Sequence, residues 1–419
     1  MVRKTDTPQP IVAMNIGSAG VRAIAADWDE RHQMFHIIDS ETSANRHQCV
    51  EKGIITNASD VGFMLNETWK KLNNRVGRGD LTNVFVCIGG RSLTSVHVEA
   101  HRQQRRSEVR KKLLNEMLRE CSEKIEARTP TAGVVAVLPE RWEIDGEVYD
   151  SVPEETEGRD ITLYATAFVM RKEYSTKIDD AIARSAMQIR HREMIPDACI
   201  TALTIDEERE KGCAVIDLGA QTTTLTIYKN NQFELTKVIP LGGYHVSHDL
   251  ETLGISATDA EKLKLRWGTL SLKPAEANQA LRIPSVREGE EPLIVTRANI
   301  SSIIACRVNE IIMPLLAEVE KAGVGIIYLT GGAAMLKGIV PFLRKKTSIP
   351  VEYGSHAQWL SHDTEDEYYK PLYGTLIGTL LLGQAYKETH PEEKKSNKLG
   401  GGKFANIMSS LFGAEDDEY

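Results

Sequence analysis

The chain has 419 residues, a formal net charge of −8 and 41% hydrophobic residues. That length predicts two or more domains rather than one core, and the acidic balance argues against nucleic acid as a partner. Six cysteines are scattered without a CxxC pair, which is typical of reduced core thiols in a cytosolic compartment. We find no apolar leader at the start and no run of about 18 apolar residues, so we expect neither a signal peptide nor a membrane span.

The first distinctive stretch, at residues 11–25, is an apolar strand, a tight turn and a returning strand. Asn15 stands two positions before Gly17, and the small residues Ser18 and Ala19 follow. Glycine permits backbone conformations that other residues avoid, and the N–H groups of such a turn can point at a single anion. The stretch therefore predicts a phosphate-binding turn, with an ordinary hairpin as the alternative.

Residues up to about 81 are typical of an α/β half-domain, with a strand at 35–39 and a helix at 61–72. From residue 82 the pattern changes to a unit of strands and one long helix with an apolar face. Its expected elements are strands at 84–88, 94–99, 134–138 and 161–170, a helix at 108–127 and a hairpin at 142–149.

A basic run accompanies the expected helix of this unit. It could serve as a partner or lipid surface, whereas the plainer interpretation is a solvated helix start. The run consists of Arg102, Arg105, Arg106, Arg110, Lys111 and Lys112.

The second distinctive stretch, at residues 213–228, repeats the pattern of the first. Its first strand ends at Asp217, Gly219 opens the turn, and a second strand alternates threonine with apolar residues. The N–H and hydroxyl groups of Gln221–Thr223 can point at one anion, although a hairpin turn again explains the pattern. Two such hairpins about 200 residues apart indicate an internal duplication.

A third glycine turn follows an apolar strand at 326–330. Gly331, Gly332 and Ala333 come first, and Met335 lies at the start of the helix that we expect next. Closely spaced glycines let the backbone approach a flat or charged ligand. The turn is therefore a third candidate for ligand binding.

Taken together, the three turns resemble those of the actin/Hsp70/sugar-kinase superfamily. The position of the inserted unit, and the order of the motifs over about nine tenths of the chain, resemble the FtsA family of bacterial division proteins. The resemblance implies an α/β, actin-like (ribonuclease H-like duplicated) fold with two halves around a nucleotide cleft. It also implies an FtsA-type inserted accessory subdomain and a C-terminal amphipathic helix.

The resemblance also divides the chain into parts. The expected linker has almost no large apolar side chains, so it cannot bury enough surface to fold. The expected parts are a first core half at 1–81 and 170–212, the inserted accessory subdomain at 82–169, a second core half at 213–243 and 317–386, a second accessory subdomain at 244–316, a flexible linker at 387–402 and an amphipathic helix at 403–413.

Family resemblance assigns ATP and Mg²⁺ to the cleft. The first two turns would hold the phosphates from opposite sides, the third would lie under the adenosine, and Glu261 with Lys264 on one helical face would contact ribose and base. Without the other motifs, Glu261 and Lys264 would be interpreted as a solvated salt bridge within one helix. The residues expected to bind the nucleotide are Asn15, Gly17, Ser18, Ala19, Asp217, Gly219, Ala220, Gln221, Thr222, Thr223, Gly242, Gly243, Glu261, Lys264, Gly331, Gly332, Ala333 and Met335.

Asp217 is the expected Mg²⁺ ligand and the one candidate catalytic residue. Asn15 stands where hydrolysing relatives carry an acid, and a neutral amide is a poorer magnesium partner. Ala220 and Gln221 stand where relatives carry more glycine, which restricts backbone approach to the phosphates. We therefore expect ATP binding with weak or absent hydrolysis, in which the nucleotide closes the cleft and gates polymerisation.

The second accessory subdomain carries Arg297 and Arg307 beside the apolar stripe of an expected helix at 297–316. In the resembled family this part binds the C-terminal tail of the tubulin-like protein FtsZ. Both arginines are thus candidate contacts for that tail, and solvated arginines are the alternative.

The expected helix at 403–413 places five large apolar side chains on one face. A helix this short is marginal in water, so it needs a membrane interface or a protein groove. The linker favours the membrane, because a helix that packed on its own domain would need no long tether. Nearby lysines would add attraction to anionic lipid, and many assembled copies would bind through avidity. The lipid-facing residues are Phe404, Ile407, Met408, Leu411 and Phe412.

These expectations combine into an adaptor that polymerises on the cytoplasmic face of the inner membrane, as a peripheral protein of the division site, and tethers FtsZ filaments there. Its expected partners are the FtsZ tail, copies of itself, lipid and other division proteins. The alternatives are an ATPase or small-molecule kinase of the same superfamily, or a pilus-assembly relative, which would lack the membrane tail. A kinase would need a catalytic acid over its substrate, and only Asp217 stands out.

Overall fold

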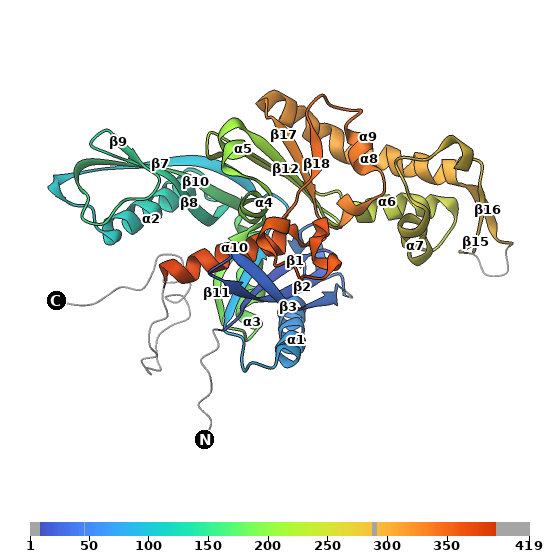
Figure 1. The fold of residues 1–419 in the computed structure, drawn as a ribbon, viewed down its shortest axis with the longest axis horizontal. Helices are drawn as coiled ribbons and strands as arrows, with labels where there is room; N and C mark the ends of the chain where they lie inside the picture. The colour runs from blue at the N-terminus through green and yellow to red at the C-terminus, as the bar shows by residue number, and fades with distance from the viewer. Residues whose placement is uncertain (1–8, 46, 287–290, 391–419) are drawn as a thin grey trace, which may run out of the picture.

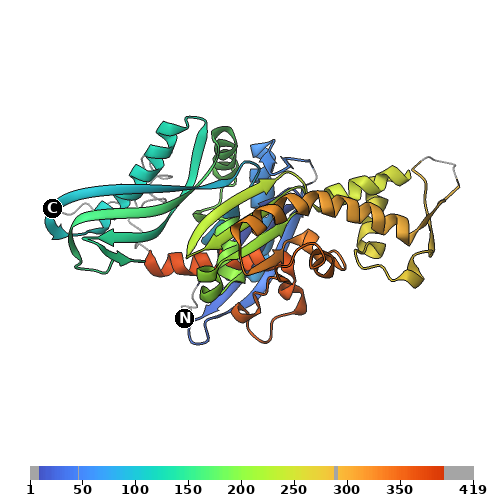
Figure 2. The same ribbon diagram turned by 90° about the horizontal axis from the view of Figure 1, so that it is seen from above.

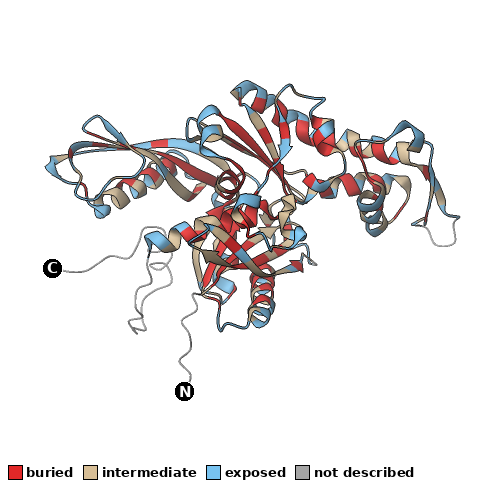
Figure 3. Ribbon diagram, in the orientation of Figure 1, coloured by how far each residue is buried: buried red, intermediate tan, exposed pale blue. Residues whose placement is uncertain are grey.

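The computed structural model describes residues 9–45, 47–286 and 291–390. Two five-stranded sheets form its centre, one in each half of the molecule (Figure 1). Seen from above, one accessory unit extends from one end of the molecule and a second unit from the other (Figure 2). Buried residues concentrate in the two central sheets and in the helices that cover them (Figure 3).

The two central sheets share one topology. The first has the order β3-β2-β1-β6-β11 and the second β14-β13-β12-β17-β18, in each case an antiparallel meander followed by two parallel strands. This repetition confirms the duplication that the two hairpins predicted. The strands are β1 Ile11–Gly17, β2 Gly20–Asp29, β3 Met34–Ala44, β6 Asn83–Ile88, β11 Ile189–Met194, β12 Cys213–Leu218, β13 Thr223–Lys229, β14 Gln232–Ile239, β17 Ile326–Thr330 and β18 Val351–Tyr353.

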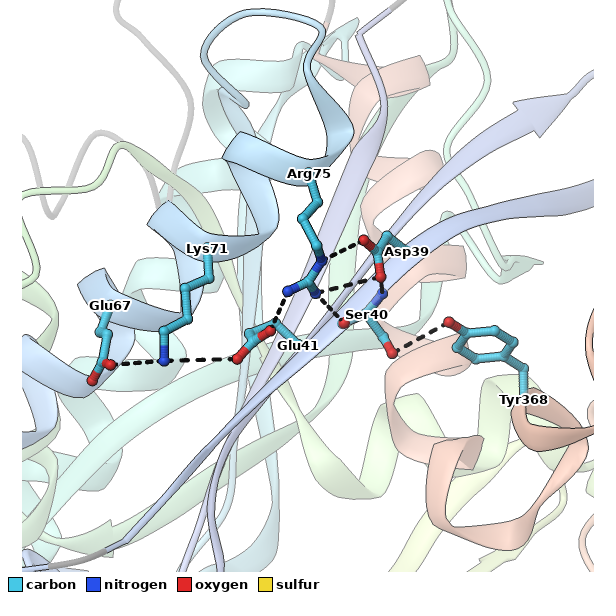
Figure 4. Close-up of polar contacts among 7 residues, drawn as sticks. All are labelled: Asp39, Ser40, Glu41, Glu67, Lys71, Arg75 and Tyr368. Atoms are coloured by element: carbon cyan, nitrogen blue, oxygen red, sulfur yellow. Dashed lines mark hydrogen bonds and ion pairs between the residues drawn. The ribbon is translucent and has the colours of Figure 1, made fainter.

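Helices cover both faces of the first sheet. The side chain of Asn57 caps the first turn of α1, and Gly77 ends this helix in the left-handed conformation. Near that end, Arg75 donates to the carboxylates of Asp39 and Glu41 on β3 (Figure 4), which fixes α1 to the sheet. The elements around this sheet are α1 Ala58–Val76, α3 Lys172–Arg184, α4 Ile195–Leu203, α10 Gly374–Thr389 and the small hairpin β4 Val50–Glu51 and β5 Ile54–Ile55.

The second sheet is covered mainly by α8, which runs from the second accessory unit into the core. Its buried side chains pack against β12, β13 and β17 and extend past the expected boundary at 316, as Val319 shows. By length and composition α8 could cross a membrane, but this burial identifies it as a core helix. The elements of this half and its accessory unit are α5 Asp206–Lys211, α6 Gly243–Leu250, α7 Ala257–Trp267, β15 Ala280–Ile283, β16 Leu293–Thr296, α8 Arg297–Ala322 and α9 Ile339–Leu343.

The other accessory unit is a four-stranded antiparallel sheet of order β7-β10-β8-β9. Helix α2 packs against one of its faces. Phe168 of β10 contacts Phe233 of β14, with ring centroids 5.1 Å apart, so this unit also packs on the second half. Its elements are β7 Thr94–Glu108, α2 Lys111–Arg128, β8 Ala132–Ile144, β9 Glu147–Tyr149 and β10 Glu157–Arg171.

The start of this inserted unit differs from the sequence expectation. The strand at 83–88, which we expected inside the unit, is β6 and pairs with β1 in the first central sheet. Its side chains are all buried, as befits an inner parallel strand. The insertion therefore begins after β6 and not at residue 82.

Strand β7 is longer than predicted, because β10 has the same length and pairs with it along almost its whole course. Helix α2 consequently begins at Lys111 and not at 108. The first part of the basic run, Arg102, Arg105 and Arg106, thus lies on a strand, which corrects the interpretation as a helix start. Arg102 donates to Glu120 of α2 at 2.9 Å.

Helix α10 continues to Thr389, so the segment that we expected as a linker from 387 begins inside this helix. Tyr386 stacks on His390 with ring centroids 4.2 Å apart, which extends the packed structure to that residue. The expected amphipathic helix at 403–413 lies outside the described residues.

Candidate functional site

A cavity of about 780 Å³ lies between the two central sheets. It is lined by the β1–β2 turn, the β12–β13 turn and the turn that follows β17. Three segments that are far apart in the sequence therefore face one hollow. Of the residues predicted to bind nucleotide, those that line it are Asn15, Gly17, Ser18, Ala19, Asp217, Gly219, Ala220, Gln221, Thr222, Gly243, Glu261, Lys264, Gly331, Gly332, Ala333 and Met335.

Two predicted residues lie behind the cavity wall. The hydroxyl of Thr223 is buried and donates to the carbonyl of Leu241 at 2.8 Å, whereas the next residue, Thr224, lines the cavity. Successive strand residues face opposite sides, so the prediction missed the facing position by one residue. Gly242 packs under the second turn, where a Cβ would lie 2.5 Å from the carbonyl oxygen of Gly219.

The first turn is held by its neighbours in the first half. Gly17 and Gly20 form the last pair of the hairpin, and a Cβ on Gly20 would lie 2.0 Å from the carbonyl oxygen of Ser43. The amide of Asn45 donates to the carbonyl of Ser18 at 2.9 Å. These contacts fix the turn before any ligand binds.

The turn between β4 and β5 lines the cavity through Gly53 and connects the two halves. The N–H of Lys52 donates to the side-chain oxygen of Gln221 at 2.7 Å, and the N–H of Gly53 donates to the hydroxyl of Ser18 at 3.3 Å. A Cβ on Gly53 would lie 2.9 Å from Thr222, so only glycine fits there. The side-chain oxygen of Gln221 therefore joins the second turn to the first half, so this oxygen is not available to a ligand in the cavity.

We expect Gln221→Ala to lower the free energy of unfolding by about 0.5–1 kcal/mol, because one hydrogen bond between the halves is lost. Amide hydrogen exchange at Lys52 should become faster, since its N–H loses its acceptor. Gln221→Glu keeps an acceptor oxygen and serves as the matched control. Unchanged exchange at Lys52 in the alanine variant would contradict this role.

Asp217 is the penultimate residue of β12 and lines the cavity wall, opposite Thr224 and Thr330 in the sheet. Burial raises the pKa of its carboxyl from the ordinary 3.8 to about 6. Across the described part of the chain, the carboxylates that line the cavity are Asp217, Glu251 and Glu261, and no group of three metal-ligating side chains occurs. One carboxylate at the phosphate turns fits a metal ion that takes its other ligands from a phosphate and water.

Glu261 and Lys264 lie one turn apart on α7 and face the cavity from the second half. Their charged groups are 2.8 Å apart, and Lys264 also donates to the carbonyl of Gly243 at 3.0 Å. Glu261 accepts a short hydrogen bond from Ser247. The pair is thus an ion pair and a cavity-lining feature at once, so the two interpretations left open by the sequence are compatible.

The sequence interpretation missed two cations that line the cavity, Arg22 and Lys337. Arg22 lies directly opposite Asn15 in the β1–β2 hairpin. Opposed residues of an antiparallel pair share a face, so the hairpin register alone could have placed Arg22 beside Asn15. Lys337 follows the third turn by two residues and carried no pattern of its own.

Arg297 and Arg307 both have partners within the chain. Arg297 lies 3.1 Å from the carboxylate of Glu276 and over the ring of Trp267. Arg307 donates two hydrogen bonds of 2.7 Å to Asp249. Neither guanidinium therefore presents an unpaired charge to an outside carboxylate.

Two sheets of one topology around a cavity lined by glycine turns define an actin-like ATPase fold. A chain of the PilM-PilN type IV pilus biogenesis complex shares it with a TM-score of 0.62 and 13% identity, over 89% of this chain and 98% of that one. MreB5 of Spiroplasma citri bound to ADP shares it with a TM-score of 0.52 and 12% identity, over 92% of this chain and 99% of that one. At such identities the likeness concerns the fold alone.

Sequence comparison points to one family within that class. A family model described as cell division protein FtsA matches residues 214–378. FtsA of Neisseria meningitidis is 27% identical over 242 residues, which are 55% of this chain and 58% of the relative. FtsA of Pseudomonas aeruginosa is 23% identical over 382 residues, which are 89% of each chain. The predicted resemblance to the FtsA family is confirmed, and several of these matches span little more than half of the relative's length.

Proposed function

We propose that the chain is an ATP-binding, actin-like division protein that polymerises on the cytoplasmic face of the membrane and tethers FtsZ filaments to it. The observation that carries the proposal is the meeting of three glycine turns at one cavity between the halves. Such a cavity suits a nucleoside triphosphate, with its phosphates between the first two turns and its adenosine over the third. MreB5, which shares the fold, was crystallised with ADP and with AMPPNP.

The chemistry of the cavity favours binding over fast hydrolysis. Asp217 would hold Mg²⁺ together with phosphate oxygens, and the bound ion would neutralise phosphate charge. The neighbouring wall offers the neutral Asn15 and the apolar Ile195, and neither can take a proton from an attacking water. The nucleotide then serves as a ligand that draws the two halves together and controls assembly.

The partner surface that we propose lies on the second accessory unit. Arg297 and Arg307 stay candidate contacts for the FtsZ tail, although each already pairs with a carboxylate of the chain. The same unit exposes Val286 and Ile294, with 59% and 70% of each residue accessible. Exposed apolar side chains of this kind suit the apolar part of a short peptide tail.

A pilus-assembly adaptor is the second candidate, because the PilM-PilN chain covers almost the whole fold. A small-molecule kinase is favoured less, since Asp217 is the one carboxylate at the phosphate turns among the described lining residues. The FtsA relatives, together with the apolar face predicted at 403–413, support the division protein over both.

Co-sedimentation with vesicles of anionic lipid tests the proposal. We expect the full chain to pellet with vesicles, more so with ATP because assembled copies bind by avidity, and a chain ending at His390 to stay in the supernatant. The truncation point keeps α10 complete. Phe404→Asp should abolish pelleting, while Asn406→Asp adds the same charge on the opposite face and should weaken it little. Equal pelleting of the full and shortened chains would remove the tether from the proposal.

A further inference from the structure

If the proposed nucleotide site is right, positively charged groups in the cavity must neutralise the negative charge of the phosphates. Arg22 lies on β2, two residues after Gly20, and lines the cavity. It stands directly opposite Asn15 in the hairpin, so the two side chains share the face of the sheet that meets α10. Two strand residues span about 7 Å, a distance that an extended arginine side chain covers. The guanidinium can therefore reach a ligand seated at the first turn.

The charge of Arg22 is poorly compensated. Its Nε donates to the hydroxyl of Thr42 at 3.2 Å, and its guanidinium carbon lies 5.6 Å from the ring centroid of Tyr373. No ion pair to Arg22 occurs in the part of the chain that the structure describes, and Glu367 acts on it only through its charge, without a hydrogen bond. Burial lowers the pKa of Arg22 below its ordinary value, which is consistent with a desolvated cation that lacks a close anion.

Several other arginines contrast with Arg22, because each of them contacts a carboxylate. Arg75 has two such partners in the network of Figure 4. The pairs are Arg75 with Asp39 and Glu41, Arg192 with Asp179, Arg209 with Asp206 and Arg307 with Asp249. A half-buried cation that faces a cavity without such a partner is available to bind an anion there.

We propose that Arg22 binds phosphate oxygens of the nucleotide directly and supplies the positive charge that a metal would otherwise bring to the first turn. The neutral Asn15 is what makes this possible. An acid at position 15 would pair with Arg22 and leave the phosphates to a metal ion, whereas an amide leaves the guanidinium free. The nucleotide is therefore held with little dependence on Mg²⁺.

Calorimetric titration of the full chain with ATP, ADP and adenosine, each with Mg²⁺ and with EDTA, tests this role. Chelation should weaken ATP binding by the wild type less than about tenfold. Arg22→Gln should weaken ATP binding about 10- to 100-fold, the range expected for a hydrogen bond to a charged group, ADP less, and adenosine not at all. Arg78→Gln is the matched control, because Arg78 pairs with Asp27 at 2.6 Å and does not line the cavity.

Asn15→Asp is the second variant and keeps the test decisive if Arg22→Gln fails to fold. It should weaken ATP binding in EDTA and recover it with Mg²⁺, because the new acid pairs with Arg22 and offers a metal ligand. Absence of ATP binding by the wild type would refute the proposed function. Wild-type ATP binding that Arg22→Gln leaves intact, or that Asn15→Asp leaves unchanged in EDTA, would refute the role of Arg22 alone.

Discussion

Asp217→Asn is expected to raise the free energy of unfolding of the nucleotide-free protein by about 1–3 kcal/mol at pH 8. The carboxyl of Asp217 lies in the cavity wall, where burial raises its pKa from 3.8 to about 6. Above that pH the folded protein must hold a charged group in a poorly solvated place, which costs stability. Asparagine has nearly the same shape and removes the charge.

The direction of the pH dependence follows from the same shift. Between about pH 4 and pH 6 the folded chain keeps a proton on Asp217 that the unfolded chain has released. The contribution of this group to stability therefore falls as the pH rises through that window and stays low above it. The gain from Asp217→Asn should accordingly be largest at pH 7–8 and should vanish near pH 4.

Urea unfolding of both proteins between pH 4 and pH 8, followed by tryptophan fluorescence, measures this effect. Asp259→Asn is the control of opposite sign, because hydrogen bonds from Ser256 and Lys262 lower the pKa of Asp259. Loss of the Asp259 carboxylate should lower the free energy of unfolding at neutral pH. Calorimetry adds a second readout: the remaining effect of Mg²⁺ on ATP affinity should disappear in Asp217→Asn. A variant no more stable than the wild type at pH 8 would refute the buried charge.

The glycine turns could be predicted from the sequence because their signal is local. Gly331 stands where a ligand must approach and has a positive φ, and few other residues serve there. The duplication could be predicted as well, since it repeats the same local signal. Which of Thr223 and Thr224 faces the cavity could not be predicted. It depends on the register of the strand against its neighbours, and a shift of one residue exchanges the two faces.

Contacts between distant segments carried no local signal. Arg297 and Arg307 look like exposed charges on a helix, yet each also pairs with a carboxylate of another element, Asp249 of α6 in the case of Arg307. The bond from Lys52 to Gln221 joins residues 169 positions apart. In the same way, the length of β7 is set by its pairing with β10, which composition cannot reveal.

Substitutions of the two glycines at the third turn, Gly331 and Gly332, should affect stability and ATP affinity separately. Gly331 has φ 90° and ψ 166°, a conformation open almost only to glycine, and a Cβ there would lie 2.3 Å from the carboxylate of Asp217 and 2.5 Å from the carbonyl of Leu218. We expect Gly331→Ala to lower the free energy of unfolding by about 2–4 kcal/mol, from backbone strain and these clashes together.

Gly332 is the matched control, because it also lines the cavity but a Cβ there would meet no atom within 4 Å. Gly332→Ala should leave the free energy of unfolding within about 0.5 kcal/mol of the wild type. Its methyl group would project into the space that the ligand uses, so ATP affinity should fall about tenfold. Urea unfolding and calorimetry on the two variants separate these effects. If Gly332→Ala bound ATP as tightly as the wild type, the nucleotide could not lie against the third turn, whereas equal stability of Gly331→Ala would show that the strained backbone can relax.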